Sequence, residues 1–522
     1  MSRNLRLAVL AALVLAFYGS GLSHTPPHLH HDEVIISLQA HSIASTGHDI
    51  EGRRMPLYFF MPHLGDRAWY QPTIIYVTAL FLKFLPSAEA SFRFPTAVLA
   101  TLDVLLMFFV ARRLFASDRW GFVAALLLAM TPAHVILGRV AFDFIYPLPF
   151  ILGWLWALLV YLDRRETWRL FAATSVLGIG MFSYIASVAM MPVYLLLTLF
   201  VVLAAGRLSL KAAAAAVGGF AWPLLILVPW IILEPSFVQD ILHRYSLAGG
   251  PSAGVHVSAI SDRVTLYWTF FNPAFLFLMG GFTHLTASTR LVGVFLLPFV
   301  VLIPLGLIQM VTSVRTAMST LIVAGFATAP LAAVLTVNEP YASSRQLAIL
   351  VFGVLIAVYG MQRLRQWRGA GRFVAAALVA LLPVHFAFFA THYFGAYHGY
   401  AAAQFEWNHK DALAAIIERN GADHPQPVYL TATRDPRQWI DAFWRLALAL
   451  HKREDLMART QYFDTTKSSI IDQIPVGAFV LASTDDKALL DGVKSGEFTQ
   501  ILAAPEPADE PVLYVLQRTV RR

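Results

Sequence analysis

Residues Trp69–Phe115 read WYQPTIIYVTALFLKFLPSAEASFRFPTAVLATLDVLLMFFVARRLF, and this stretch decides the fold of the chain. It begins with a short apolar segment, Pro72–Pro86, and continues into a longer apolar run that ends at Arg112 and Arg113. A run of about 20 apolar residues is long enough to cross a bilayer as a helix. Arginines at the end of such a run favour the cytoplasmic side. The stretch therefore predicts a membrane span whose arginine end is cytoplasmic.

The rest of the chain repeats this pattern. Its 522 residues are 57% hydrophobic and 14% charged, whereas soluble proteins average about 25% charged residues. Apolar runs recur up to about residue 393, so we expect an all-α polytopic membrane protein. The absence of cysteine excludes disulfides, thiolate metal sites and a cysteine nucleophile. The net charge of +7 does not indicate nucleic-acid binding, because most basic residues before residue 393 lie in short loops between apolar runs.

The segment Pro72–Pro86 allows two topologies. If it crosses the membrane, every later loop changes side; if it lies along the interface as a short helix, the later loops keep their sides. In the second topology the expected spans are the long apolar runs, namely Leu5–Leu22, Phe92–Val110, Gly121–Leu137, Pro147–Tyr161, Leu170–Tyr184, Ser187–Ala205, Ala212–Leu233, Leu291–Val311, Ala317–Val337, Leu347–Met361 and Phe373–His392.

The basic residues choose between these topologies. With Pro72–Pro86 at the interface, the cytoplasmic loops hold clustered basic residues, namely Arg3, Arg6, Arg112, Arg113, Arg119, Arg164, Arg165, Arg169, Arg207, Lys211, Arg315, Arg363, Arg365, Arg368 and Arg372. The opposite assignment places all of these residues except Arg3 and Arg6 outside, against the positive-inside rule. We therefore expect about eleven spans, and at most about thirteen, in a bacterial inner (plasma) membrane. The N-terminus is expected to be cytoplasmic, with the first span retained as a signal anchor.

This topology gathers the long loops on the extracytoplasmic side. The loops expected there are residues 23–71, 138–146, 234–289 and 338–345, followed by the tail after residue 393. Long outer loops with short basic inner turns indicate an enzyme or a receptor that works at the outer face. A transporter or flippase of a lipid-linked substrate would usually carry inverted or parallel repeats, and the sequence has no evident internal repeat.

The composition becomes that of a soluble domain near residue 400. Segments typical of helices alternate with segments typical of strands: NHKDALAAIIERNG and PRQWIDAFWRLALALH predict helices, and PVYLTA, GAFVLAS and PVLYVLQ predict strands. The expected organisation is a transmembrane domain over residues 1–399 and a small extracytoplasmic α/β domain over residues 400–522. The small domain carries no phosphate-binding loop, so we expect it to stabilise the protein or present an acceptor.

The stretch HLHHDEVIISLQAHS, His28–Ser42, contributes the first candidate site residues, Asp32 and Glu33. The plain interpretation is a helix start, because aspartate is a favoured N-cap and glutamate in the first turn suits the helix dipole. The two roles are compatible, since a carboxylate at a helix start can also accept a substrate proton. Both residues are therefore kept as catalytic candidates.

Further ionisable residues lie in the short outer loops. Arg139 and Asp143 share one loop, where ionisable groups near membrane depth indicate function; a mutual salt bridge is the alternative. Arg345 follows Glu339 and Tyr341 in another outer turn. Its planar guanidinium suits phosphate oxygens, with an interface anchor as the alternative.

The first outer loop is also rich in cationic and metal-binding side chains. Arg54 is a candidate for phosphate binding, with an exposed, solvated arginine as the alternative. His31 and His63 belong to a group of early histidines that, with the nearby acids, could bind a divalent cation. Their spacing matches no specific metal motif, so no cofactor is assigned.

Five blocks together resemble the GT-C class of integral membrane glycosyltransferases, and within it family 39, which includes the protein O-mannosyltransferases and the aminoarabinose transferases of lipid A. The blocks are Asp32-Glu33 after the first span, Trp69–Phe115, Ala125–Phe150, Tyr267–Gly281 and Tyr341–Gly360. The resemblance covers essentially residues 1–400. It implies a GT-C fold and an inverting transfer of a hexosyl or pentosyl group from a polyprenyl-phosphate-sugar donor to an extracytoplasmic acceptor.

The resemblance also implies roles for individual residues. Asp32 matches the first-loop aspartate that acts as general base, and Glu33 is the adjoining acid that binds or orients. Asp143 matches a second-loop acid of some relatives. Arg345 would stabilise the leaving phosphate, with Arg139 as a further candidate.

Two departures from the family pattern matter. Where many aminoarabinose-type relatives have Lys-Pro-Pro, this chain has Gln71-Pro72-Thr73, so phosphate binding would depend more on Arg345, Arg54 or a metal, with Gln71 offering a hydrogen bond. Tyr70, Tyr341 and Glu339 are expected to line the substrate site. The MIR domain of eukaryotic mannosyltransferases is absent, which weakens the case for a protein acceptor. A glycolipid, a polysaccharide and a protein all stay open as acceptors. A flippase and a non-catalytic scaffold in envelope assembly are the alternative functions.

Overall fold

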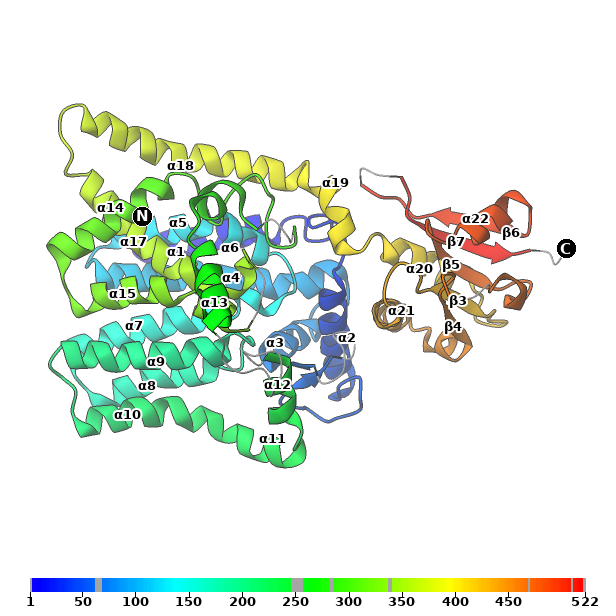
Figure 1. Ribbon diagram of the computed structural model, residues 1–522, viewed down its shortest axis with the longest axis horizontal. Helices are drawn as coiled ribbons and strands as arrows, with labels where there is room; N and C mark the ends of the chain where they lie inside the picture. Colours follow the sequence, from blue (N-terminus) through cyan, green and yellow to red (C-terminus); the bar gives the residue numbers. More distant parts are fainter. Residues whose placement is uncertain are drawn as a thin grey trace.

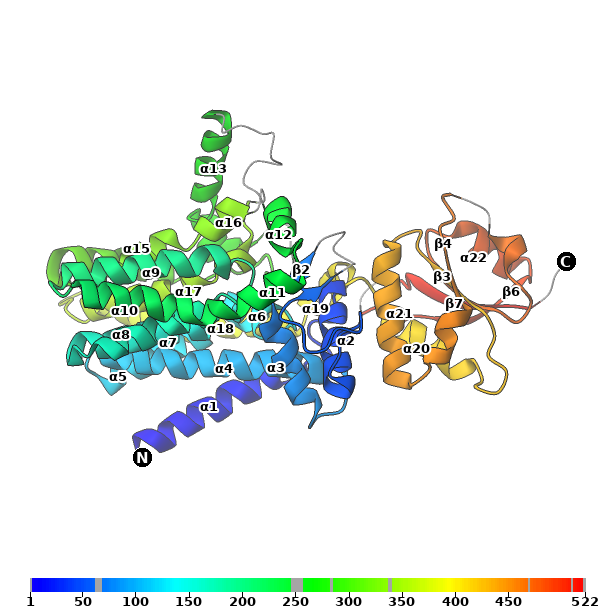
Figure 2. The same ribbon diagram turned by 90° about the horizontal axis from the view of Figure 1, so that it is seen from below.

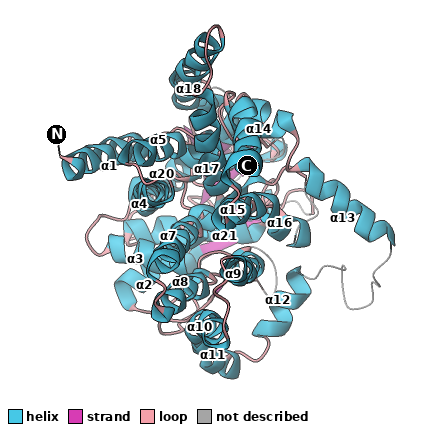
Figure 3. Cartoon of the chain, turned by 90° about the vertical axis from the view of Figure 1, so that its left-hand side faces the viewer, coloured by secondary structure: helices cyan, strands magenta, loops and turns pink. Residues whose placement is uncertain are grey.

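A computed structural model describes residues 2–61, 68–245, 257–281, 285–336, 340–467, 470–507 and 510–519. It contains a bundle of long apolar helices and, at one end of the bundle, a small α/β domain formed by the C-terminal part of the chain (Figure 1). Seen along the bundle, many of the long helices appear end-on (Figure 3). The chain is thus a helical membrane protein with one appended domain, as the sequence predicts.

Six helices in the described part of the chain are long and apolar enough to cross a membrane: Glu89–Leu114, Asp143–Arg164, Ser187–Ala204, Leu210–Leu233, Ala317–Leu335 and Gly371–Phe394. Shorter apolar helices accompany them at Pro72–Leu82, Phe299–Val314 and Ala348–Leu364. The first expected span corresponds to α1 (Arg3–Gly19), which has 17 residues. The helix α3 (Pro72–Leu82) has only 11 residues, too few to cross a bilayer, for which about 20 are needed.

Most expected spans coincide with helices. Ala212–Leu233 is interrupted by the 3-10 helix Trp222–Ile226, and Ala317–Val337 is broken between α15 (Ala317–Thr328) and α16 (Leu331–Thr336). Two further spans differ in their boundaries. The expected span Gly121–Leu137 is divided into α5 (Asp118–Ala129) and α6 (Pro132–Leu137), because Pro132 starts a new helix. The expected span Leu291–Val311 begins too early, since α14 covers Phe299–Gln309 and continues as a π-helical turn, Met310–Val314. Pro298, the N-cap of α14, marks its start.

The two ends of the bundle differ in their connections. The turns between α4 (Glu89–Leu114) and α5, between α7 (Leu148–Arg164) and α8 (Thr167–Gly180), and between α9 (Ser187–Ala204) and α10 (Leu210–Ala221) lie away from the C-terminal domain (Figures 1 and 2). These turns carry the arginine clusters of the sequence. The end that faces the C-terminal domain instead carries α2, α3 and α19.

The helix α2 (His31–Thr46) crosses the end of the bundle that faces the C-terminal domain. Its start is a capping box: Asp32 N–H donates to His30 Nδ1 at 3.2 Å, and His30 N–H donates to Glu33 Oε2 at 3.1 Å. It ends at Gly47, whose φ of 74° is left-handed and favours glycine. A two-stranded antiparallel pair, β1 (Phe59–Phe60) and β2 (Trp69–Tyr70), then leads into α3.

The C-terminal domain has a five-stranded sheet in the order β4-β3-β5-β7-β6. β3 (Val428–Thr431) pairs in parallel with β4 (Thr460–Phe463) and β5 (Phe479–Ser483), whereas β7 (Leu513–Arg518) pairs antiparallel with β5 and β6 (Phe498–Ala503). The helices are α20 (His409–Arg419), α21 (Arg437–His451) and α22 (Lys487–Lys494). The sequence did not predict β4. The expected domain boundary at residues 399–400 falls inside α19 (Tyr397–Ala401), and it stays a prediction.

The C-terminal domain packs against the start of the first outer segment. The helix α21 contacts α2. At their edge the buried Glu506 side chain joins the two parts, since Glu506 Oε2 lies 3.0 Å from His28 Nε2 and Glu506 Oε1 accepts from Asn408 N–H at 2.8 Å. Lys410 Nζ lies 3.2 Å from Glu89 Oε2. The domain is therefore held directly over the N-terminal end of α2.

Candidate active site

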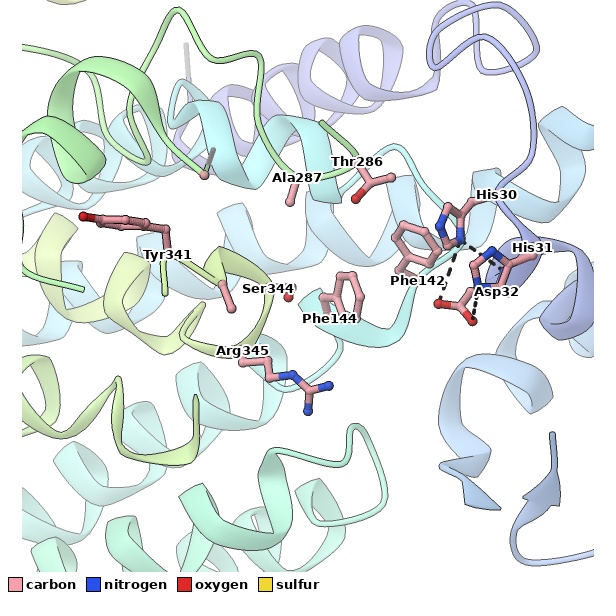
Figure 4. Close-up of a pocket in the computed structure, with 12 residues that line it drawn as sticks. His30, His31, Asp32, Phe142, Phe144, Thr286, Ala287, Tyr341, Ser344 and Arg345 are labelled. Carbon is pink, nitrogen blue, oxygen red and sulfur yellow. Dashed lines mark hydrogen bonds and ion pairs between the residues drawn. The ribbon is translucent and has the colours of Figure 1, made fainter. Parts of the chain in front are cut away.

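A cavity of about 280 Å³ lies at the end of the bundle next to the C-terminal domain. Four segments that are distant in sequence contribute to its walls: the start of α2, the loop around η2 (Asp143–Ile145), the segment that contains Gly281, Thr286 and Ala287, and the turn that contains η6 (Ser343–Arg345). The lining residues are His30, His31, Asp32, Phe142, Phe144, Gly281, Thr286, Ala287, Tyr341, Ala342, Ser344 and Arg345 (Figure 4).

Asp32 lies on the cavity wall, at the first turn of α2. Its side chain is 22% exposed, and its carboxylate oxygens lie 3.6 Å from His31 Nε2 and 3.9 Å from His30 Nδ1. The capping bonds of this helix are made by His30 and Glu33, and not by the Asp32 side chain. A partly exposed carboxylate at a helix start, open to a cavity, can accept a proton from a bound hydroxyl group.

Asp143 lies behind this wall and is fully buried. Its Oδ1 accepts a hydrogen bond from Tyr70 Oη at 2.9 Å, and it interacts electrostatically with Asp32 and Arg345. Burial raises the pKa of Tyr70 well above its ordinary value, and the carboxylates of Asp143 and Asp32 raise it further. Tyr70 therefore stays protonated and donates a hydrogen bond to Asp143 Oδ1.

Arg345 and Tyr341 form another part of the cavity wall. In Figure 4 the guanidinium of Arg345 points into the same space as the Asp32 carboxylate, and Phe144 lies between them. Tyr341 has a left-handed backbone with a φ of 63°, and its ring lies 5.4 Å from that of Phe275. The cavity thus carries a carboxylate and a guanidinium with aromatic side chains between them.

Glu33 points away from the cavity, toward α4. Its carboxylate receives two hydrogen bonds of 2.8 Å from Arg93 and one of 2.7 Å from the backbone N–H of Ala141. Glu33 and Arg93 are both fully buried. The remaining Arg93 donors bond the carbonyls of Leu22, Pro26 and His28. Glu33 is therefore placed to orient α2 on the bundle and does not line the cavity.

The other candidates for phosphate binding do not line the cavity either. Arg139 is buried and donates to the carbonyls of Phe17, Tyr18 and Thr25. Arg54 is exposed on the first outer segment. Gln71 is buried at the N-cap of α3. These positions suit support of the outer segments.

Two expected site residues, Glu339 and His63, lie outside the residues that the structure describes. Their proposed roles, in substrate lining and in metal binding, stay predictions. His31, the other metal candidate, lies on the cavity wall.

Comparison with known proteins gives a family match and a fold match. Residues 66–233 match the model of the dolichyl-phosphate-mannose-protein mannosyltransferase family. The structure of ArnT from Cupriavidus metallidurans bound to undecaprenyl phosphate superposes with a TM-score of 0.57 at 12% identity, covering 97% of each chain. The apo structure of the same ArnT gives 0.56 at 14% identity, covering 99% of this chain and 98% of that one. No curated protein sequence matches the chain.

The chain has the GT-C fold. The match to ArnT over nearly the whole length includes the C-terminal domain, so the expected fold class and the resemblance to aminoarabinose-type transferases are confirmed. The long apolar helices make this GT-C protein an integral membrane protein.

The structure also places against His31, a lining residue of the cavity, two side chains that the sequence did not indicate. Glu406, which is 7% exposed, accepts a hydrogen bond of 2.6 Å from the backbone N–H of His31 and contacts His31 Nδ1. Trp439 of α21 stacks on the His31 ring with centroids 3.8 Å apart and an interplanar angle of 9°. Burial alone would lower the pKa of His31, but the hydrogen bond to Glu406 and the carboxylates of Asp32 and Glu406 outweigh it and leave that pKa raised. No local sequence pattern linked these residues to α2.

Proposed function

We propose that this protein is an inverting glycosyltransferase that moves a sugar from a polyprenyl-phosphate donor to an extracytoplasmic hydroxyl or phosphate acceptor. The observation that carries the proposal is the cavity itself. It joins a carboxylate from the first outer segment, Asp32, to a guanidinium from a distant outer turn, Arg345. A base and an anion-binding group on one cavity are what a group transfer from a phosphate carrier requires.

Asp32 is assigned the role of general base. In an inverting transfer the acceptor oxygen attacks the anomeric carbon while its proton moves to a carboxylate. The bond from that carbon to the carrier phosphate breaks on the opposite face. Asp32 suits this role because its carboxylate borders the cavity and is partly exposed. General-base catalysis contributes roughly 10²–10⁴-fold to the rate.

Arg345 is assigned to the carrier phosphate, whose negative charge increases as the sugar leaves. A guanidinium offers a planar pair of donors that matches phosphate oxygens. Its position across the cavity from Asp32 (Figure 4) suits a sugar bound between the attacking and leaving groups. The ArnT structure that shares this fold holds undecaprenyl phosphate, and we infer a carrier of the same chemical class here.

Asp143 and Glu33 are assigned supporting roles. Asp143 accepts a hydrogen bond from Tyr70 and, when ionised, attracts Arg345 and repels Asp32, so it would help to orient the Arg345 guanidinium. Glu33 would fix the start of α2 through Arg93. The C-terminal domain, which contacts α2 beside the cavity, would face the acceptor.

The membrane orientation follows the positive-inside rule, with the N-terminus cytoplasmic and the cavity extracytoplasmic. The arginine-bearing turns lie at the end of the bundle away from the cavity (Figure 2), which supports this orientation. The membrane would be a bacterial inner membrane.

The proposal is tested in cells that lack the protein and are complemented with wild-type, Asp32→Asn or Asp423→Asn chains. Asp423 is exposed in the C-terminal domain and gives the same charge loss away from the cavity. Mass spectrometry of the envelope lipids and glycans is expected to reveal a sugar-bearing species with the wild type and Asp423→Asn only. Full restoration of that species by Asp32→Asn would contradict the general-base role of Asp32. Identical envelope lipids and glycans in cells with and without the protein would contradict the proposed transferase function.

A further inference from the structure

Three consecutive side chains at the start of α2 gather their metal-binding atoms on the cavity wall. His30, His31 and Asp32 each offer one ligand atom, and these atoms lie within 4.8 Å of one another. The His30 and His31 ring centroids are 4.0 Å apart, and His31 Nε2 lies 3.6 Å from Asp32 Oδ1. Two ligand atoms of a tetrahedral zinc site are separated by roughly 3.3 Å, given bonds of about 2.0–2.1 Å. Small side-chain rotations would bring these three groups to that spacing.

Glu406 orients His31 as a metal ligand. The His31 ring contacts Glu406 through Nδ1, and the His31 backbone N–H donates to Glu406 Oε2 at 2.6 Å. A proton held on Nδ1 by the carboxylate leaves the lone pair of the neutral ring on Nε2, the nitrogen that faces Asp32. A carboxylate that holds the distal nitrogen of a histidine in this way is the usual outer partner of a metal-ligating histidine.

The backbone and a neighbouring ring hold this arrangement in place. Glu406 and Trp407 are consecutive non-glycine residues with left-handed backbones, at φ values of 58° and 64°. Such conformations are strained for residues that carry a Cβ and persist where the surrounding structure requires them. Trp439 covers the His31 ring in parallel at 3.8 Å. The ring plane of His31 is therefore fixed by a carboxylate at one edge and an indole on one face.

His30 completes the set from the other side of Asp32. Its Nδ1 lies 3.9 Å from Asp32 Oδ2 and accepts the capping hydrogen bond from Asp32 N–H at 3.2 Å. A cation bound at this nitrogen would replace that long capping bond. The His30 ring also stands edge-on to Phe142 at 5.3 Å, beside the cavity.

The charge around the cluster favours a cation. The carboxylates of Asp32, Glu406 and Asp435 all lie within electrostatic range of His31. Among the described lining residues, Arg345 is the permanently charged cation, and it extends from another wall (Figure 4). Two imidazoles with one carboxylate suit Zn²⁺ better than the oxygen-seeking Mg²⁺ or Ca²⁺.

We propose that His30, His31 and Asp32 bind one zinc-like divalent cation, with Glu406 as the carboxylate that orients His31 and with a fourth position open to the cavity. Three protein ligands and one open position are the pattern of a site that takes a substrate oxygen. The open position would accept an oxygen of the acceptor, next to the carbon that it attacks. This last step rests on the proposed transferase function, whereas binding of the cation does not.

Cation binding is tested on the full-length protein in detergent after removal of metals with EDTA. Isothermal titration with ZnCl₂, and metal analysis after gel filtration, are expected to give one Zn²⁺ per wild-type chain. His31→Ala is expected to lose this site, and Glu406→Gln to weaken it by about 10–100-fold. His41→Ala is the matched control: His41 lies on the same helix, where it bonds Ser87, and this variant is expected to bind as the wild type does.

Each outcome decides the proposal. The absence of saturable Zn²⁺ binding to the wild type, or equal binding by wild type and His31→Ala, overturns it, because the cation then binds elsewhere or not at all. If His31→Ala does not elute as a folded protein, Glu406→Gln carries the same comparison. If His31→Ala loses Zn²⁺ binding while Asp32→Asn keeps full function, the cation site is supported and the general-base role of Asp32 is contradicted. If the wild type does not bind Zn²⁺ while Asp32→Asn is inactive, the cation site is contradicted and the general-base role of Asp32 is supported.

Discussion

Arg93 donates two parallel hydrogen bonds to the Glu33 carboxylate, from Nε to Oε1 at 2.8 Å and from Nη2 to Oε2 at 2.8 Å. Neither side chain is exposed to solvent. Arg93 comes from the long helix α4, and Glu33 from the first turn of α2. The same arginine bonds three backbone carbonyls of the segment between α1 and α2. This pair therefore connects the membrane bundle to the helix that carries Asp32.

Removal of the arginine is expected to destabilise the protein. Arg93→Ala leaves a buried Glu33 carboxylate without its charged partner, and the loss of one partner of a buried pair costs about 3–5 kcal/mol. The apparent melting temperature of the purified protein in detergent is expected to fall by several degrees. Lys410→Ala breaks the exposed ion pair with Glu89 and is expected to change the melting temperature little. Equal stability of wild type and Arg93→Ala would contradict the structural role of the pair.

The hydrogen bond from Tyr70 to Asp143 predicts a pH-independent contribution to activity. The raised pKa of Tyr70 keeps the phenol protonated well above pH 10, its ordinary value. A group with a raised pKa contributes fully below its ordinary value and loses its contribution only as the pH rises through the raised value. Tyr70→Phe is thus expected to lower kcat because the hydrogen bond to Asp143 is lost, and Tyr70 itself is expected to add no alkaline limb to the wild-type pH profile below about pH 9. An alkaline limb that disappears in Tyr70→Phe would show that Tyr70 titrates in this range.

Arg345 is expected to govern binding of the lipid phosphate. Arg345→Ala should lower kcat by about 10²–10³-fold, the usual effect of removing one donor to a developing anion. Arg345→Lys keeps the charge without the planar pair of donors, so its kcat should lie between those of the wild type and Arg345→Ala. Arg54→Ala is the control, because Arg54 is exposed and does not line the cavity. Native mass spectrometry with undecaprenyl phosphate measures the binding directly, and equal binding by wild type and Arg345→Ala would contradict the assignment.

The membrane bundle could be predicted because span formation is a local property. An apolar run of about 20 residues must become a helix in a bilayer, whatever the rest of the chain does. Errors arose where local signals were weak. The short edge strand β4 (Thr460–Phe463) has mostly half-exposed or exposed side chains, so it lacked an alternating apolar pattern. The residues before Pro298 are apolar without being helical.

The cavity could be predicted only in part. Asp32 was a candidate because it follows the first span and matches the first-loop aspartate of the family that the chain resembles, and Arg345 because a guanidinium in an outer turn suits phosphate oxygens. The sequence could not separate Asp32 from Glu33, although adjacent helix residues point about 100° apart. One of them lines the cavity and the other bonds Arg93. Glu406 and Trp439 could not be found at all, since only tertiary packing brings them to His31.

The stacking of Trp439 on His31 predicts that the C-terminal domain steadies the start of α2. Trp439→Ala removes the parallel ring at 3.8 Å and is expected to speed amide hydrogen exchange in the first turns of α2 by about tenfold, because aromatic pairs contribute roughly 0.5–1.5 kcal/mol beyond area burial. Trp168→Ala removes an indole that is 61% exposed in the first turn of α8 and serves as the control. Unchanged exchange in Trp439→Ala would mean that the domain does not stabilise this helix.

The absence of cysteine from the chain makes the membrane orientation directly measurable. A single cysteine at Leu208, in the turn between α9 and α10, lies at the end of the bundle away from the cavity, whereas a cysteine at Ala422 lies on the surface of the C-terminal domain. The positive-inside rule places the arginine-rich turns in the cytoplasm. An impermeant maleimide applied to spheroplasts is therefore expected to label Ala422→Cys at once and Leu208→Cys only after lysis. The opposite labelling would put the cavity on the cytoplasmic side, and a polyprenyl-phosphate donor would then have to present its sugar to that side of the membrane.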